Sequence, residues 1–368
     1  MLKRVANRLK AASTVINDPT RKTLDTMLIE IVQLWVRDRA KPAHYYGDAL
    51  YRKDLHDNIY AYVGTSNLMN LLGRINDPFW APVVDNKILF DLFFRKTDIR
   101  LPKLLGYNNA KQFTIGNDVM WVSSRKQLLT ALELLVGSSP TTSVFAKPAG
   151  GMQGKGCLLF DLSDVPGICA DKGLELLSSD YVYQEVIDQH PQMAELHPSS
   201  LNTLRIVTYR ADRGEASVMS AFVRMGVNRS FTDNVSAGGC FVGVDLEQGT
   251  LVQNGFTMPE VGWSVLQRHP DTEVVFDGFA IPFFQEVLSV AGRAAELMPL
   301  AVVGWDIAIS EDGPVIIEGN ANCHLGASEM ADGGYYRNPV FRRLIEDHSP
   351  EMRRVARQFD KAYPGQGG

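Results

Sequence analysis

The chain has 368 residues, a formal net charge of −5 and a charged fraction of 21%. This length allows two or three domains around a large buried core, and 45% hydrophobic residues are ordinary for a globular protein, which excludes disordered and fibrous classes. The acidic balance disfavours nucleic acid as a partner, because nucleic-acid binding usually depends on a basic surface.

The first residues and the cysteines do not indicate export. The four cysteines lie far apart, so their spacing predicts neither a zinc site nor a disulfide framework and favours a cytoplasmic location. Residues 1–22 carry six Lys/Arg against Asp18 and lack an apolar signal-peptide core, and we expect no transmembrane segment. Their charge allows weak contact with an anionic membrane surface; a solvated helix end is the other interpretation.

The first eighty residues are predicted to be helical. A second helix is expected over residues 87–96, followed by an extended stretch around Pro102. The apolar residues at the start of the helical region recur at i, i+3, i+4, i+7 and i+11, which places on one helix face Leu24, Met27, Leu28, Ile31 and Trp35.

From about residue 143 the pattern changes to short strands with turns. Hairpins are expected around 212–214, 247–250 and 311–313, and a helix over 282–298. Helices followed by largely antiparallel strands, with further helices between them, predict an α+β fold.

The segment FAKPAGGMQGKGCLLF, residues 145–160, places a glycine-rich loop between two apolar strands. Glycine lets backbone N–H groups approach a ligand closely, and Lys147 and Lys155 supply point charges suited to phosphate. The loop matches neither the Walker A pattern nor GxGxxG, and both of those lead from a strand into a helix. We therefore expect a hairpin flap over phosphates, with a flexible surface hairpin as the alternative. Residues 232–240 form a second candidate anion-binding loop.

Two carboxylates are predicted to face each other in the last hairpin. If the chain turns about Asp312, Asp306 pairs with Glu318, and Asn320 projects on the same side. Facing carboxylates repel, a divalent cation removes the conflict, and these oxygen ligands suit Mg²⁺; a solvated sheet edge is the alternative. The opposite face of the hairpin would be apolar, with Ile307, Ile309, Val315 and Ile317.

Arg205 and Arg224 lie within strands otherwise suited to burial, which favours recognition of phosphate or carboxylate over an exposed position. They share a sheet face only if the hairpin has a two-residue turn, or a bulge with the same effect, so that Thr203 opposes Arg224. We expect this register, with both guanidinium groups directed toward Asp306.

The order and spacing of these motifs resemble the ATP-grasp superfamily, and most of all the bacterial sugar-transfer associated ATP-grasp family, which is similar to α-L-glutamate ligases. The resemblance rests on Asn86-Lys87, FAKP with its glycine flap, YVYQEVI, the two arginine strands and Asp…Glu-x-Asn, and it extends over residues 46–339. It implies an ATP-grasp fold, in which two α+β lobes grip ATP. The implied divisions are a helical region (1–85), a first lobe with the flap (86–184), a second lobe with the metal site (185–345) and a C-terminal tail (346–368).

The resemblance also implies residue roles. Arg205 and Arg224 would stabilise the transferred phosphoryl group. Gln184, Glu185 and Ile187 would hold adenine largely through backbone groups. The full set of implied ATP contacts is Lys87, Lys147, Gly150, Gly151, Gly154, Lys155, Gln184, Glu185, Ile187 and Asp188. The implied ligands for Mg²⁺, with Mn²⁺ as an alternative, are Asp306, Glu318 and Asn320.

The implied activity is that of an ATP-dependent carboxylate–amine ligase, which activates a carboxylate as an acyl phosphate and joins it to an amine or hydroxyl. The family name suggests a small-molecule or glycoconjugate carboxylate as the substrate. A small-molecule kinase and a non-catalytic nucleotide-binding module are the alternatives. The acceptor pocket stays undefined, because Gly304 stands where several such ligases carry arginine, and His190, His324 and Glu329 have either substrate or structural roles.

Overall fold

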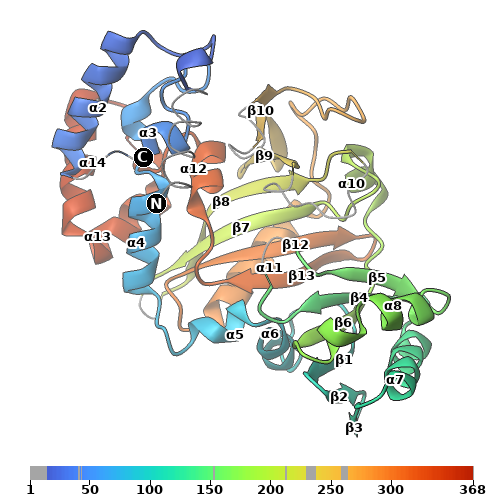
Figure 1. Ribbon diagram of the computed structural model, residues 1–368. Coiled ribbons are helices and arrows are strands. Elements are labelled where there is room, and N and C mark those ends of the chain that lie inside the picture. The colour runs from blue at the N-terminus through green and yellow to red at the C-terminus, as the bar shows by residue number, and fades with distance from the viewer. Residues whose placement is uncertain are drawn as a thin grey trace, which may run out of the picture.

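The structure, a computed structural model, places two antiparallel sheets beside a helical region (Figure 1). The strands that it describes pair in antiparallel fashion, and helices accompany both sheets, so the α+β class expected from the sequence is confirmed. The described residues are 15–39, 42, 44–151, 154–211, 214–228, 238–257 and 264–367.

The helices and strands follow one another in blocks along the chain. The α-helices are α2 (Leu24–Asp38), α3 (His44–Gly47), α4 (Thr65–Ile75), α5 (Ala81–Asp85), α6 (Lys87–Phe94), α7 (Arg125–Ser138), α8 (Val165–Asp171), α9 (Gly173–Leu176), α10 (Pro191–Leu196), α11 (Phe284–Glu296), α12 (Leu325–Asp332), α13 (Pro339–His348) and α14 (Pro350–Ala362). The strands are β1 (Leu104–Asn109), β2 (Gln112–Ile115), β3 (Asp118–Trp121), β4 (Ser143–Pro148), β5 (Leu158–Asp161), β6 (Tyr181–Glu185), β7 (Thr203–Arg210), β8 (Ala216–Met225), β9 (Cys240–Asp245), β10 (Thr250–Thr257), β11 (Val265–Leu266), β12 (Val302–Ser310) and β13 (Gly313–Asn320).

The smaller sheet has the order β3-β2-β1-β6-β4-β5 and packs against α7 and α8. Helix α7 begins at a capping box, in which Ser124 accepts from the backbone of Gln127 and the Gln127 side chain accepts from the backbone of Ser124. Strands β4 and β5 pair up to Ala146 and Leu158, so the glycine-rich loop joins two strands, as expected. This sheet carries the flap.

The larger sheet has the order β11-β10-β9-β8-β7-β12-β13 and packs on α11, with α12 and α13 also contacting its strands. Helix α6 touches both β13 of this sheet and β6 of the smaller one. Its Phe90 and Phe94 pack into the larger sheet's core, where Phe94 meets Trp305 edge-on. Helix α6, predicted to start the first lobe, therefore connects both lobes.

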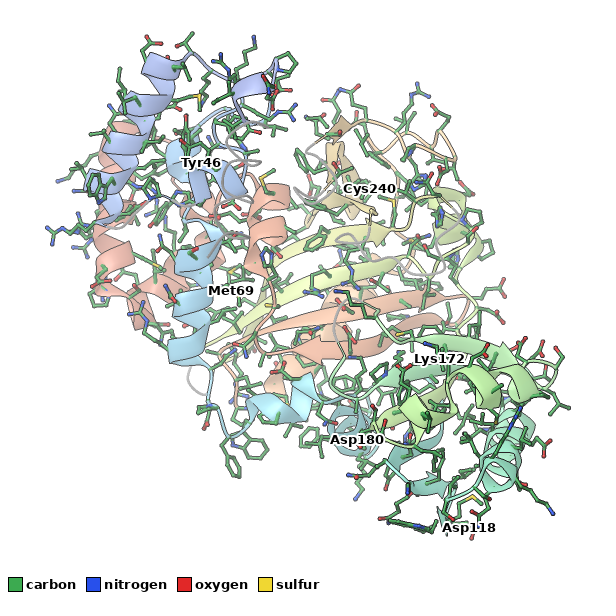
Figure 2. All side chains as sticks on the ribbon, in the orientation of Figure 1. Tyr46, Met69, Asp118, Lys172, Asp180 and Cys240 are labelled. Carbon is green, nitrogen blue, oxygen red and sulfur yellow. The ribbon has the colours of Figure 1, made fainter. Side chains whose placement is uncertain are left out.

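The helical region contains helices from both ends of the chain. Helix α14 occupies most of the expected C-terminal tail, and Arg354 Nη2 donates to the carbonyl of Arg37 at the end of α2 (2.9 Å). Figure 2 shows Tyr46 and Met69 in this region, with Asp118 at the far end of the smaller sheet. In the described part of the chain, the helices are too short or too polar to span a membrane.

Helix α2 differs from the prediction in the face that it buries. Of the predicted face, Met27 is buried and Ile31 packs partly buried against the core, whereas Leu24, Leu28 and Trp35 are exposed. Leu34, which lies outside the predicted face, is also buried. The helix is apolar on more than one side, so the period alone did not identify the buried one.

The last hairpin pairs Asp306 with Glu318 as predicted, but its turn and register differ from the prediction. The turn is the two-residue Glu311-Asp312, and a register shift between Asp306 and Ile307 restores the pairing of Asp306 with Glu318. Because of this irregularity, Ile316 is buried in the core while Ile317 lines a cavity. The prediction that Ile317 belongs to the core face was wrong.

Candidate active site

A cavity of about 390 Å³ lies between the two sheets. The smaller sheet contributes Lys147 from β4 and Glu185 from β6, and the larger sheet contributes Arg224, Asp306 and Glu318. Residues far apart in the sequence therefore meet in one cleft that both lobes form.

Asp306 is the most enclosed charged group of the cavity. Arg205 Nε and Nη2 both donate to its carboxylate, and Arg224 Nη2 lies 3.0 Å from Oδ2. Burial alone would raise the pKa of Asp306, but the charges of Arg205 and Arg224 outweigh burial and hold this pKa below its ordinary value. Asp306 therefore stays ionised throughout the physiological range.

Both arginines share a sheet face because of the predicted register. Thr203 opposes Arg224 and Arg205 opposes Phe222, while the strands shift register between Val207 and Thr208. A bulge therefore gives the shared face, which was one of the two stated ways to reach it; residues 212–213 lie outside the described residues. The expected direction of both guanidinium groups, toward Asp306, is confirmed.

Two lysines approach the cavity from the first lobe. Lys87 is the first residue of α6, which Asn86 caps, and its Nζ lies 3.1 Å from Glu318 Oε2 and 2.8 Å from the carbonyl of Gly151. Lys147 is buried, and this burial lowers its pKa despite the opposing charge of Glu318. With Arg224 in the lining and Arg205 paired to Asp306 from outside it, cations outnumber carboxylates around Asp306 and Glu318, a local excess that favours an anionic ligand. Glu185 and Asp188 add two further carboxylates elsewhere in the lining.

The proposed metal ligands are only partly assembled around the cavity. Asp306 and Glu318 line it, whereas Asn320, two residues beyond Glu318, lies outside its lining. The amide nitrogen of Asn320 is buried without a hydrogen-bond partner among the described residues, so its own neighbours leave this amide unsatisfied. In the same part of the chain, no cluster of three His, Cys, Asp or Glu side chains could hold a metal ion.

The flap contributes Gly151, Gly154 and Lys155 to the cavity, and Gly150 does not line it. The backbone of Lys87 donates to the carbonyl of Ala149 (2.9 Å), which ties the base of the flap to α6. Residues 152–153, at the tip, lie outside the described residues.

The segment after β6 forms the cavity wall between the lobes. Glu185, Ile187 and Asp188 line the cavity, as expected. Gln184 pairs with Phe145, which does line it, but α6 covers Gln184, and its amide donates to the buried Asp91 (2.8 Å). The Gln184 side chain therefore does not reach the cavity.

Sequence reasoning missed the apolar wall of the site, which consists of Phe145, Leu159 and Ile317. Phe145 could have been found, because it lies two residues before Lys147 on the same strand face. Two of the three residues left open have structural contacts: His190 caps α10, and Glu329 is buried against the backbone of Val63 and Gly64.

Comparison with known proteins identifies a family. A family model described as sugar-transfer associated ATP-grasp matches residues 67–340. No curated protein matches the chain. Similar solved structures include the ATP-grasp ligase PsnB complexed with minimal precursor, at 16% identity and TM-score 0.39, over 69% of this chain and 57% of that one. D-alanyl-alanine synthetase A from Vibrio cholerae is 13% identical with TM-score 0.43, over 80% of this chain and 72% of that one. The chain thus spans little more than half of PsnB.

Proposed function

Because the chain belongs to the sugar-transfer associated ATP-grasp family, we propose that it is an ATP- and Mg²⁺-dependent ligase that activates a carboxylate as an acyl phosphate and joins it to an amine or hydroxyl. The observation that carries this proposal is the convergence of Lys87, Lys147 and Arg224 on one cavity with Asp306 and Glu318. Arg205 lies outside the lining and pairs with Asp306. Such a set suits a triphosphate whose charge increases where the phosphoryl group is transferred.

The cavity lining combines apolar surface with charged groups, a combination that suits ATP. Phe145, Leu159 and Ile317 supply apolar surface beside Glu185 and Ile187, which suits a purine ring held by backbone groups. The lysines and the flap would contact the phosphates, because Gly151 and Gly154 in the lining let the backbone approach a ligand closely. Asp188, which lines the cavity, would contact the ribose.

Mg²⁺ would be held by Asp306, Glu318 and Asn320, and it would supply charge neutralisation for the β- and γ-phosphates. The facing carboxylates of Asp306 and Glu318 fit this role. The unsatisfied atom of Asn320 is its amide nitrogen, which donates hydrogen bonds and does not bind a cation, so it gives no support for Asn320 as a ligand. Because the carboxylates are now paired with Arg205, Arg224 and Lys87, metal binding requires these cations to shift toward the phosphates.

The reaction follows from this arrangement. A substrate carboxylate oxygen attacks the γ-phosphorus, the bond to the β-phosphate oxygen breaks, and ADP leaves. The amine or hydroxyl then attacks the acyl carbon, loses its proton and expels phosphate. Arg205 and Arg224 stabilise the charge on the transferred phosphoryl group. The family description supports a small-molecule or glycoconjugate carboxylate as the substrate.

The test is turnover with a mixture of metabolites. The purified protein, ATP and Mg²⁺ are incubated with a metabolite extract, and products are identified by mass spectrometry. A ligase releases ADP and free phosphate together with a condensed product. A phosphorylated product without free phosphate would show a kinase, and the lack of substrate-dependent ADP release would show a binding module; either result would overturn the proposal.

A further inference from the structure

Helix α2 presents a second apolar face to solvent. Leu24, Leu28 and Ile29 are 61%, 63% and 55% exposed, and Val32, Trp35 and Val36 are 46%, 56% and 72% exposed. These six residues, here called the α2 strip, are among nineteen exposed large apolar side chains in the described part of the chain, yet they lie within thirteen consecutive residues. An apolar patch this concentrated marks an interaction surface, whereas scattered exposed residues do not.

The strip occupies one side of the helix. At 100° per residue, its members fall within an arc of about 140°, and Asp25 is the only polar residue of α2 inside that arc. Met27 and Leu34 face the opposite way, into the core that α2 shares with α14. The helix therefore has one face for the fold and another face for a partner.

The sequence before α2 and the neighbouring helix α14 are both rich in cations. Residues 1–22 carry six Lys/Arg and one Asp, a net charge of +5, whereas the whole chain carries −5, so the other 346 residues carry −10. On α14, Arg353, Arg354, Arg357 and Lys361 line one shallow cavity. Arg354 connects that helix to the end of α2, and Glu346 is an acidic neighbour of Arg353 and Arg357. Figure 1 shows α2 and α14 along the same side of the molecule.

We propose that the α2 strip, together with the cations of α14, docks the protein on an anionic lipid membrane, with α2 lying in the plane of the headgroups. Apolar side chains that include tryptophan, next to lysine and arginine, match the chemistry of an interfacial helix. Each cation near an anionic leaflet adds to the attraction. A second copy of the chain is a less suitable partner for the strip, because a two-fold contact through α2 would bring the cations of both copies closer together.

The test uses the full chain and vesicles of phosphatidylcholine, with and without phosphatidylglycerol. We expect sedimentation with the anionic vesicles and at least about tenfold weaker binding to the neutral ones. The double variant Leu28→Glu, Val32→Glu should lose at least about tenfold in binding to anionic vesicles. The matched control is Leu174→Glu, because Leu174 on α9 is exposed but distant in sequence and fold. Arg357→Glu with Lys361→Glu tests the cationic part and should also weaken binding.

Folding is checked separately from docking. ADP release without vesicles should be equal in all these variants, so a loss of binding cannot be attributed to misfolding. Equal sedimentation of the wild type and the Leu28/Val32 variant would overturn the proposal. So would a dimer that the variant abolishes without any vesicle binding, which would assign the strip to a second copy. Protection of Trp35 from acrylamide quenching in lipid-free protein, without vesicle binding, would show that the chain covers the strip itself.

Discussion

Arg224 on β8 reaches Asp306 on β12 across the intervening strand β7, with Nη2 3.0 Å from Oδ2. Asp306 also binds Arg205, so one buried carboxylate holds two guanidinium groups in one place. Burying a charge without a partner is costly, so this triad stays assembled until a more favourable anion displaces it. The proposed γ-phosphate is that anion.

Arg224→Ala should lower kcat/KM for ADP release by about 10²–10³-fold, because it removes one donor to the transferred phosphoryl group. The fold should persist, since Arg205 still compensates Asp306. Arg268→Ala is the control, because Arg268 is exposed on the same lobe. Kinetics within about twofold of wild type in Arg224→Ala would exclude the proposed role, given the magnitude expected for such a donor.

Glu318→Gln should abolish most Mg²⁺-dependent ADP release, because it removes one of the two carboxylates that face the metal position. The matched control is Glu311→Gln, an exposed residue in the turn of the same hairpin. Calorimetric titration of ADP with and without Mg²⁺ measures the metal contribution apart from turnover. Normal Mg²⁺ enhancement of ADP binding in Glu318→Gln would contradict the metal assignment.

The sequence predicted pairing wherever alternation and turns were both clear. Asp306 and Glu318 face one another, and Arg205 and Arg224 share a face, as predicted, but in each hairpin a register shift produces this pairing. Ile317 was misplaced because an irregularity in one strand moves a single residue without changing the pattern on either side.

The other differences between the sequence predictions and the structure have different physical causes. The buried side of α2 could not be chosen from periodicity, because the helix carries a second apolar arc for which the sequence names no partner. Gln184 has the correct strand face, but a helix from elsewhere in the chain covers it, and its partner Asp91 is 93 residues away. Such contacts depend on tertiary packing, which local patterns do not encode.

Gly150 and Gly151 of the flap have different surroundings, so alanine substitutions at the two positions should have different effects. A Cβ on Gly151 would lie 2.9 Å from Pro148 Cβ, whereas a Cβ on Gly150 would meet nothing within 4 Å. Gly151→Ala should therefore displace the flap and raise KM for ATP, by about tenfold if the cost is near 1.4 kcal/mol. Gly150→Ala is the matched control and should differ little from wild type.

Hydrogen exchange gives an independent measure of the same flap. Residues 149–151 and 154–156 should become more protected when ATP and Mg²⁺ are added, because glycine-rich segments with few apolar contacts open easily. High protection before nucleotide, unchanged afterwards, would argue against a closing flap.

Gln184 is expected to act as a positioning residue. Its Nε2 donates to Asp91 Oδ2, and Asp91 also accepts both Nε and Nη2 of Arg95, so β6 and α6 are joined through a buried carboxylate. Gln184→Leu should reduce the free energy of unfolding by about 1–3 kcal/mol. It should also raise KM for ATP with little change in kcat, since α6 carries Lys87 at its start.

A second variant, on helix α6, tests the same contact between β6 and α6. Arg95→Lys keeps a charge near Asp91 but loses the two-pronged contact, so it should destabilise the protein in the same direction. Urea unfolding measures the stability of both variants, and initial rates measure KM. A Gln184→Leu protein with wild-type stability and an unchanged KM would contradict the link between β6 and α6.

The buried carboxyl of Glu329 leads to a prediction of how the protein's stability changes with pH. This carboxyl of α12 is buried and accepts backbone N–H groups from Val63, Gly64 and Tyr335, but burial is the larger effect and raises its pKa from 4.5 to about 8. Between these values the native protein keeps a proton that the unfolded chain has released. The contribution to stability is therefore fully present below about pH 4.5 and is lost as the pH rises to about 8.

The free energy of unfolding should then fall with rising pH in this window, by up to about 1.4 kcal/mol per pH unit for this one group. Glu329→Gln has no proton to release, so the slope should become shallower, although overall stability also drops because an amide NH₂ cannot accept from a backbone N–H. Asp332, whose pKa burial raises to about 7, acts in the same direction and leaves some slope. Urea unfolding across the window measures both slopes, with exposed Glu351→Gln as the control. If Glu329→Gln keeps the wild-type slope, the three backbone donors outweigh burial, and Glu329 is ionised in the folded protein.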